Sequence, residues 1–294
     1  MELFIMTLVQ GVLMGGIYAL VALGWVIIYK CSGVLNLAMG ELTLIGAYVT
    51  LTFYMAGAPF IVAVLLTLLV GAILGTLVER VFLDRLIGES VLSVIMVTVG
   101  LSFFLKGVVE YFWGTDTRVF APPVFSLHPI VVGFLKISPV QLWSFLLAIV
   151  LLILLVAFFK FTRWGLSMQA TADDETAALS LGVSARFVYA ASWAIAFMSA
   201  GVGGALLGNI NGMNISVGAL GLNVLPAVVL GGLNSIPGAI VGGITIGVLQ
   251  NLSGTYLDEF FPGGVKDIAP FVFMTVFMFF KPYGLWGWER IERV

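Results

Sequence analysis

The charged residues that interrupt long apolar stretches are the first candidates for chemistry in this sequence. They are Glu41, Lys106 and Glu110. An ionisable group at membrane depth is costly, so it marks a pathway or is paired with an opposite charge. Lys106 and Glu110 are four residues apart and would share one helix face, where they could form a structural ion pair or serve a pathway. For Glu41, an interfacial position near the inner end of its helix and a functional role are both open.

Residues for catalysis or metal binding are scarce. The one cysteine, Cys31, excludes an intrachain disulfide and a cysteine-based metal cluster, and the one histidine, His128, excludes a histidine-rich metal site. No lysine follows a glycine, so the sequence lacks the G-x-x-x-x-G-K-[ST] phosphate-binding loop. We therefore identify no catalytic, cofactor-binding or metal-binding residue, and any ATP that drives this protein would be bound by another polypeptide.

The composition indicates whether water or lipid surrounds the segments that carry these residues. Of 294 residues, 61% are hydrophobic and only 10% are charged, and the mean hydropathy is +1.15. Soluble domains carry about 25% charged residues, so most of this chain must be solvated by lipid. The net charge of −2 gives no indication of nucleic-acid binding.

Apolar runs predict an all-α, polytopic transmembrane bundle of about eight or nine helices in one membrane domain, residues 1–294. The runs are 3–29, 42–78 (interrupted at 57–59), 90–113, 137–159, 187–257 and 268–285. About 20 residues cross a bilayer, so the 71 uncharged residues of 187–257 hold three helices, or two plus broken or re-entrant segments.

Basic residues in the short loops predict the orientation, because Lys and Arg concentrate in cytoplasmic loops. With the 160–186 loop inside, nine basic residues lie inside and three outside. The inside group is Lys30, Arg80, Arg85, Lys160, Arg163, Arg186, Lys281, Arg290 and Arg293, and the outside group is Arg118, Lys136 and Lys266. Segment 114–136 then becomes an outside loop, in which Pro122 and Pro123 argue against a helix.

The inside loop, 160–186, predicts a short surface helix between two spans. Asp173, Asp174 and Glu175 suit the first turn of a helix, where acidic groups favour the macrodipole. Gly182 suits a C-terminal stop. The segment is either a solvated connector or a docking helix for a cytoplasmic partner.

Five stretches of the sequence resemble the permeases of branched-chain amino acid ABC importers, the LivH/LivM-like family, and in particular its LivH-type subunits. They are GGIYALVALG at 15–24, SGVLNLAMGE at 32–41, RWGLSMQATADDETAALSLGV at 163–183, SAGVGGA at 199–205 and LGGLNSIPGA at 230–239. They occur in the family's order over nearly the whole chain. The resemblance is specific for the family and weak for the substrate.

The resemblance implies a multi-pass permease of the bacterial inner membrane that works by alternating access. It implies pairing with a second permease subunit, identical or similar. It also implies two ABC ATPase subunits docked on the inside helix and a periplasmic solute-binding protein on the outer face. The ATPase-coupling residues would be Arg163, Gly165, Ala170, Asp173, Asp174, Glu175, Ala177, Ala178 and Gly182.

Two breaks in the apolar runs, at 32–36 and 231–238, would leave free backbone groups at membrane depth. Such backbone survives only where protein or a watery cavity satisfies it, and paired breaks point to a transporter pathway. The candidate path residues are polar or charged side chains near these breaks or in the spans, each of which could instead make an interhelical hydrogen bond. They are Asn36, Glu41, Thr98, Ser102, Asn211, Asn214 and Asn223.

Other functions remain open at this point. The same architecture would serve an ABC permease for urea, short amides or aromatic acids. A channel or facilitator without an ATPase is of another class and would not need the projecting inside helix. An intramembrane enzyme is disfavoured, because the lone His128 falls in the predicted outside loop.

Overall fold

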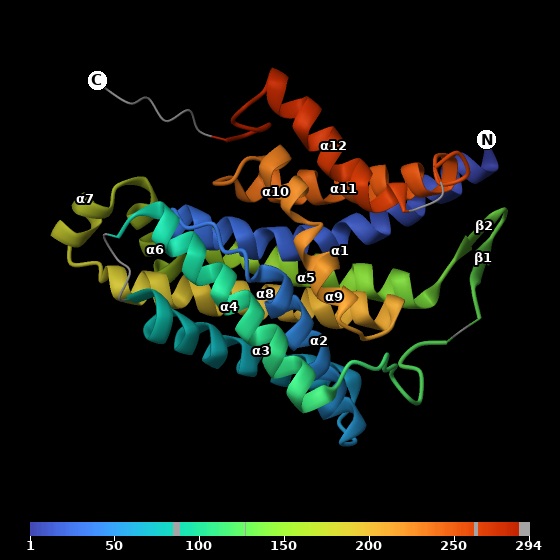
Figure 1. Cartoon of the computed structure of the whole chain (residues 1–294), viewed down its shortest axis with the longest axis horizontal. Coiled ribbons are helices and arrows are strands. Elements are labelled where there is room, and N and C mark those ends of the chain that lie inside the picture. The colour runs from blue at the N-terminus through green and yellow to red at the C-terminus, as the bar shows by residue number, and fades with distance from the viewer. Residues whose placement is uncertain (85–88, 127, 262–263, 288–294) are drawn as a thin grey trace.

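The protein folds as a bundle of helices with one small hairpin at its edge, as the computed structural model shows for residues 1–84, 89–126, 128–261 and 264–287 (Figure 1). The helices are α1 (Glu2–Ser32), α2 (Met39–Met55), α3 (Phe60–Val78), the π-helical turn η1 (Glu79–Leu83), α4 (Val91–Trp113), α5 (Pro139–Phe161), α6 (Arg163–Asp173), α7 (Glu175–Ser180), α8 (Ala185–Asn211), α9 (Ser216–Leu222), α10 (Leu225–Gly231), α11 (Ile236–Tyr256) and α12 (Val265–Phe280). The strands are β1 (Ile130–Val132) and β2 (Leu135–Ile137).

Six helices in the described chain are long and apolar enough to cross a bilayer: α1, α3 with η1, α4, α5, α8 and α11. A shorter apolar helical stretch, Ser216–Gly231, contains α9 and α10. The predicted polytopic helical fold is therefore confirmed. Within 187–257 the second alternative is correct, because two long helices flank the short α9 and α10.

The predicted outside loop contains the only strands in the described residues. β1 and β2 pair antiparallel, with Ile130 opposite Ile137, around Gly133 at a φ of 62°. Described residues between Trp113 and Pro139 form no helix, as Pro122 and Pro123 predicted. The structured connection therefore runs two residues further than the predicted 114–136, because α5 begins only at Pro139.

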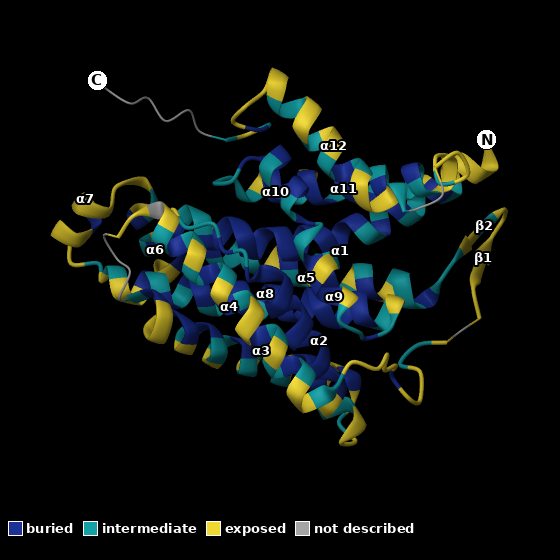
Figure 2. Cartoon of the chain, in the orientation of Figure 1, coloured by how far each residue is buried: buried dark blue, intermediate teal, exposed yellow. Residues whose placement is uncertain are grey.

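Helix α1 is the centre of the bundle. Its middle and inner parts are buried, while exposed residues collect on α3, α4 and α12 (Figure 2). Gly11 and Gly15 lie against the backbone of Val248 and Ile244 in α11, where a Cβ would overlap it. Lipid provides no hydrophobic drive between helices, so this close backbone approach through small residues is what holds α1 to α11.

A second glycine contact joins α2 to α8. Gly46 and Gly201 face each other so closely that a Cβ on Gly46 would overlap the Gly201 backbone, and Gly204 lies equally close to the Thr43 carbonyl. The glycines at 11–15 and at 201–204 thus act in helix packing. The contact places the beginning of α2 deep inside the bundle.

The first predicted break lies inside the bundle. Gly33 ends α1 with a φ of 66°, and its N–H donates to the Tyr29 carbonyl at 2.8 Å. The chain then runs without helix until Met39, and Asn36 in this stretch is only 1% exposed. Its Oδ1 accepts a hydrogen bond from the Ala38 N–H at 3.0 Å, which satisfies one free backbone donor.

The two ends of the bundle carry different elements (Figure 1). At one end the inner termini of α1, α3 and α5 meet α6 and the start of α8, as the Asp84–Arg186 ion pair at 3.5 Å shows. At the other end lie the N-terminus and the hairpin. The two loops predicted to lie on opposite sides of the membrane are thus at opposite ends of the bundle (Figure 1). Of the basic residues used in that prediction, Arg85, Arg290 and Arg293 lie outside the described residues.

We predict that Gly46→Ala destabilises the protein by about 1–3 kcal/mol, because the added methyl overpacks against the backbone of α8. Thermal unfolding in detergent measures the loss. The matched control is Gly100→Ala in α4, where a Cβ meets no atom within 4 Å. Equal thermal shifts for the two variants would contradict the proposed packing role.

Candidate functional site

The inside segment forms two short helices where the sequence predicts one. Helix α6 ends at Asp173, and Asp174 adopts an extended conformation and caps α7. Its Oδ1 accepts a hydrogen bond from the Ala177 N–H at 2.9 Å. The prediction of one short helix in this loop is therefore wrong, because the Asp174 side chain stabilises a new helix start in place of a continued α6. Of the three acidic residues, Glu175 alone lies in a first turn.

Helix α6 is anchored on the membrane bundle. Gly165 lies so close to the Phe158 and Phe159 backbone of α5 that a Cβ would overlap it. Gln169 donates from Nε2 to the Phe159 carbonyl at 2.9 Å, and Met168 is buried. Arg163 and Ala170 are exposed on the same helix. Movement of α6 must therefore move the inner end of α5.

Helix α7 presents the exposed part of the segment. Its C-terminal turn is closed by Gly182, whose φ is 85°, and the Val183 N–H donates to the Ala178 carbonyl at 3.0 Å. This confirms Gly182 as the predicted stop. Leu179 and Leu181 are 50% and 84% exposed, Ala177 is exposed, and Ala178 is buried. An apolar surface thus projects beyond the bundle on a capped, well-defined helix.

A tyrosine that the sequence reasoning did not identify ties α7 to the next membrane helix. The Tyr189 hydroxyl of α8 donates to Glu175 Oε1 at 2.7 Å. One turn earlier, Arg186 pairs with Asp84 beyond the end of η1. Glu79 in η1 is a further missed residue, buried to 3% exposure. No motif indicated these contacts, since the partners are far apart in the sequence.

Four of the seven predicted path residues meet at the first break. Thr98 and Ser102 lie one turn apart on α4, and the Thr98 hydroxyl reaches the Leu35 carbonyl at 3.5 Å. Ser102 is in hydrogen-bonding reach of the Glu41 carboxylate on α2. Asn36 and Glu41 flank the start of α2 and are 1% and 8% exposed. The break and α4 thus form one polar cluster in the bundle.

Of the two alternatives for Lys106 and Glu110, the ion pair does not form in the part of the chain that the structure describes. Among the described residues no Lys106–Glu110 contact meets the 4.0 Å limit of a salt bridge, whereas Lys106 acts electrostatically on Glu41. Lys106 stands one further turn along the face of Thr98 and Ser102. The shared face of α4 therefore interacts with α2.

The remaining predicted path residues lie elsewhere. Asn211 bonds within its own helix, from Nδ2 to the Leu207 carbonyl at 3.1 Å. Asn214 Nδ2 reaches Thr117 Oγ1 in the outside loop at 3.5 Å, and Asn223 Nδ2 reaches Asp267 Oδ1 at 3.5 Å. The seven residues therefore do not converge on one path within a single chain.

The outside loop is joined to the α8–α9 turn. Arg118 and Met213 exchange backbone hydrogen bonds at 2.8 and 2.7 Å. Beneath this bridge the Tyr48 hydroxyl donates to the Met213 carbonyl at 3.3 Å, and the Tyr48 ring lies 5.6 Å from the Trp113 ring. An open pocket of about 900 Å³ beside the bridge is lined by Leu51, Thr52, Met55, Phe112, Trp113, Arg118 and Val119. These contacts tie the outside loop to the turn after α8 and to α2.

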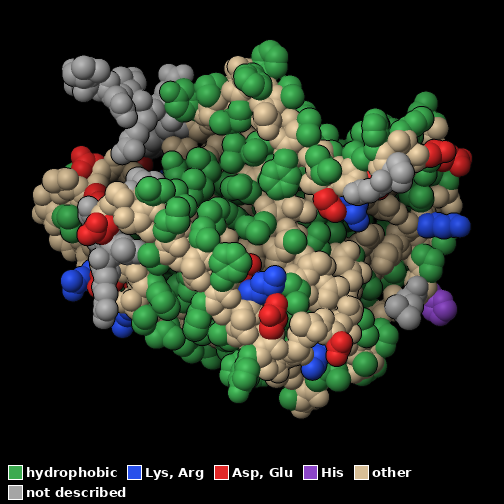
Figure 3. Space-filling model, in the orientation of Figure 1, with side chains coloured by type: hydrophobic (Ala, Val, Ile, Leu, Met, Phe, Trp, Pro, Cys, Tyr) green, Lys and Arg blue, Asp and Glu red, His purple; other side chains and the backbone are tan. Residues whose placement is uncertain are grey.

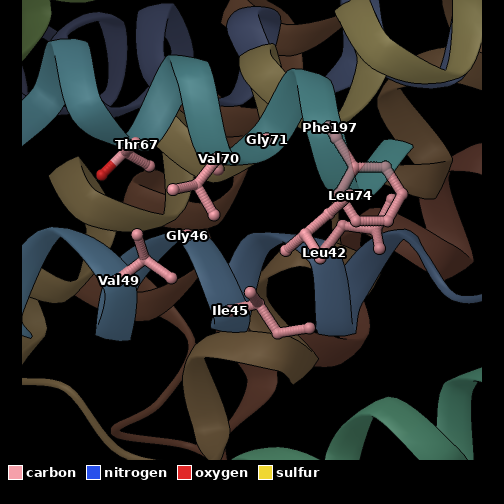
Figure 4. Close-up of a pocket in the computed structure, with 10 residues that line it drawn as sticks. Leu42, Ile45, Gly46, Val49, Thr67, Val70, Gly71, Leu74 and Phe197 are labelled. Atoms are coloured by element: carbon pink, nitrogen blue, oxygen red, sulfur yellow. The ribbon is translucent and has the colours of Figure 1, made fainter. Parts of the chain in front are cut away.

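A separate, narrow pocket with a cavity volume of only about 10 Å³ lies between α2, α3 and α8 (Figure 4). Apolar side chains and glycines line it, and its one polar side chain, Thr67, is already hydrogen-bonded to Thr50 at 2.7 Å. Hydrophobic side chains also cover much of the molecular face in Figure 3. This pocket offers no group for a charged solute, so the polar cluster is the better candidate.

Comparison with known proteins finds matches along nearly the whole chain. The family model described as "Branched-chain amino acid transport system / permease component" matches residues 7–280. The chain is 30% identical to the high-affinity branched-chain amino acid transport system permease proteins LivH of Salmonella typhimurium and Escherichia coli K12, over 99% of this chain and 98% of each relative.

A solved structure supports the fold alone. The structure described as "PsaBC from Streptococcus pneumoniae in complex with Fab" aligns with 93% of this chain and 91% of that chain, at a TM-score of 0.51 and 16% identity.

We predict that Asp174→Ala loosens α7, because the Ala177 N–H loses its acceptor. A lost N-cap costs about 1 kcal/mol, so amide exchange of residues 177–180 should quicken about five-fold. Hydrogen-exchange mass spectrometry measures this. Asp173→Ala is the matched control, since Asp173 is as exposed and caps no helix. Identical exchange in both variants would refute the capping role.

Proposed function

We propose that this chain, which belongs to the family of permease components of branched-chain amino acid transport systems, is the membrane-spanning subunit of an ABC importer in the bacterial inner membrane. Its solutes are branched-chain amino acids or closely related small amino acids. It is a multi-pass membrane protein without a phosphate-binding loop, so separate ATPase subunits supply the energy.

The observation that carries this proposal is the α6–α7 segment. Exposed Leu179 and Leu181 project from the inside end, while α6 is fixed to α5 through Gly165 and α7 to α8 through the Tyr189–Glu175 hydrogen bond. A solvated connector needs neither an exposed apolar tip nor rigid anchors. A segment that receives a push from an ATPase needs both.

Alternating access follows from these anchors. Closure of the ATPase dimer on ATP displaces α7, and the Tyr189–Glu175 and Gly165 contacts pass the displacement to α8 and α5. Since α8 packs on α1, α2 and α3, its tilt changes the surroundings of the polar cluster. The Arg118–Met213 bridge holds the outer end closed in this conformation, and its opening admits solute from a periplasmic binding protein.

The pathway is completed by a second permease subunit, identical or similar. The predicted path residues do not converge within one chain, and Lys106 on α4 is only partly buried. Pairing would bring a second bundle against such lipid-facing surfaces. Small residues and polar groups drive such helix association in lipid.

The test is co-purification combined with uptake. With Leu179→Glu and Leu181→Glu together, we expect a P-loop ATPase that accompanies the wild-type chain to be lost and uptake of labelled leucine, isoleucine and valine to fall at least ten-fold. Charges in an apolar contact carry a large desolvation cost. The matched control, Val131→Glu with Val132→Glu, puts the same charges on the exposed outer hairpin and should retain the ATPase.

Two results would overturn the proposal. If no ATPase accompanies the wild-type chain while the chain alone conducts solute in liposomes, it is a facilitator. If the ATPase binds but the assembled importer moves urea, short amides or aromatic acids and no amino acid, the importer class stands and the substrate is wrong.

We further predict that Tyr189→Phe uncouples the importer. Loss of the hydrogen bond to the Glu175 carboxylate, an interaction worth about 1.5–3 kcal/mol, should lower leucine uptake per ATP hydrolysed about ten-fold with the ATPase still bound. Parallel measurement of uptake and phosphate release gives this ratio. Tyr256→Phe, on a partly exposed tyrosine at the end of α11, is the control, and equal ratios in all three proteins would contradict transmission through Tyr189.

A further inference from the structure

Two buried polar atoms in the cluster at the first break have no partner. They are Nδ2 of Asn36 and Oε2 of Glu41, within residues that are 1% and 8% exposed. Buried polar groups are nearly always satisfied, and a buried carboxylate oxygen without a partner is costly. One atom is a hydrogen-bond donor and the other an acceptor. The cluster therefore offers one free group of each kind at a point where the helix is broken.

The Lys106 ammonium group of α4 is an opposite charge that acts on Glu41 from the neighbouring helix, and Lys106 itself is partly buried. Ser102 and Lys106 are on the α4 face that meets α2, and Lys106 acts on the Glu41 carboxylate electrostatically. No direct Glu41–Lys106 ion pair within 4.0 Å forms among the described residues. The buried Glu41 carboxylate is therefore not neutralised by a salt bridge to Lys106, and an uncompensated buried charge is strongly destabilising. The open arrangement suits a ligand that carries both charges.

We propose that Glu41 and Lys106, with Asn36, hold the charged end of an α-amino acid as it passes the middle of the membrane. The Glu41 carboxylate accepts hydrogen bonds from the α-ammonium group. The Lys106 ammonium group and the Asn36 amide donate to the α-carboxylate. This inference rests on the proposed importer function and goes beyond it, because it assigns a solute site within the permease itself.

The same geometry separates solute classes. Urea and short amides carry no net charges at either end, so they would leave the Glu41 and Lys106 charges uncompensated. An aromatic acid without an amino group would satisfy Lys106 alone. A zwitterion satisfies both charges and both unpartnered atoms. The cluster thus selects for the α-amino acid head and leaves the choice of side chain to other contacts.

The experiment measures equilibrium binding of labelled leucine to the purified full-length chain in lipid nanodiscs, without the binding protein. Competitors are leucinamide, which lacks the carboxylate, and 4-methylpentanoate, which lacks the ammonium group. We expect Glu41→Gln and Lys106→Met each to weaken leucine binding about 10- to 100-fold, the effect of one lost charge-assisted hydrogen bond. Glu41→Gln should leave 4-methylpentanoate binding unchanged, and Lys106→Met should leave leucinamide binding unchanged.

Two control variants test whether removing any charge weakens leucine binding, and further variants are available if Glu41→Gln does not fold. Glu110→Gln removes a charge from α4 two turns beyond Ser102, and Lys136→Met removes one from the outer hairpin, so both should bind leucine like the wild type. If Glu41→Gln does not fold, Lys106→Met and Ser102→Ala decide the matter. A structural role would weaken all three ligands equally, and this pattern would overturn the inference.

The outcome separates this inference from the proposed function. If the assembled importer takes up leucine while the wild-type chain, or both variants, show no charge-selective binding, the site is wrong and the importer stands. If the assembled importer moves no amino acid, the proposed function fails first, and the site for an amino acid fails with it.

Discussion

Close contact between helix backbones, made possible by glycine, is the interaction on which the rest of this structure depends. In lipid, apolar side chains gain nothing by leaving their surroundings, so helices associate through packing and polar contacts. Gly11 and Gly15 bring α11 against α1, and Gly46 with Gly201 bring α8 against α2. These contacts bury the middle of α1 and place the start of α2 inside the bundle. Without them the polar cluster would face lipid.

The non-helical segment between α1 and α2 is energetically unfavourable at membrane depth, and it is also where the candidate solute site lies. Chain without helical hydrogen bonds at membrane depth survives only where other protein groups satisfy it. The Asn36 side chain accepts from the Ala38 N–H, the Gly33 N–H donates to the Tyr29 carbonyl, and the Thr98 hydroxyl of α4 reaches the Leu35 carbonyl. What remains unpartnered is one amide donor and one carboxylate oxygen. A break that is satisfied except for two polar atoms fits a site where a solute binds for a short time.

The inside segment shows the opposite arrangement, because it is anchored at its base and exposed at its tip. Thr162 and Asp174 cap two short helices, so the segment has a definite shape without a partner. Gly165 and Tyr189 connect that shape to two different membrane helices. Helices α5 and α8 run through the bundle from the α6–α7 segment towards the polar cluster. A contact made at the inside end can therefore alter the surroundings of the polar cluster, which lies at membrane depth.

The sequence by itself determined the membrane class, the helical fold, the two breaks, the inside segment and the family. These follow from local properties: apolar run length, glycine and proline positions, and motifs of adjacent residues. Tertiary structure alone decided that Lys106 and Glu110 form no salt bridge with each other within the described residues. It also decided that Asn211, Asn214 and Asn223 lie apart from Asn36, and that Tyr189 reaches Glu175. Helical spacing predicts which residues share a face, whereas the neighbour of that face depends on how the helices pack. In lipid, that packing is set by the fit of small residues along whole helices, which no single motif contains.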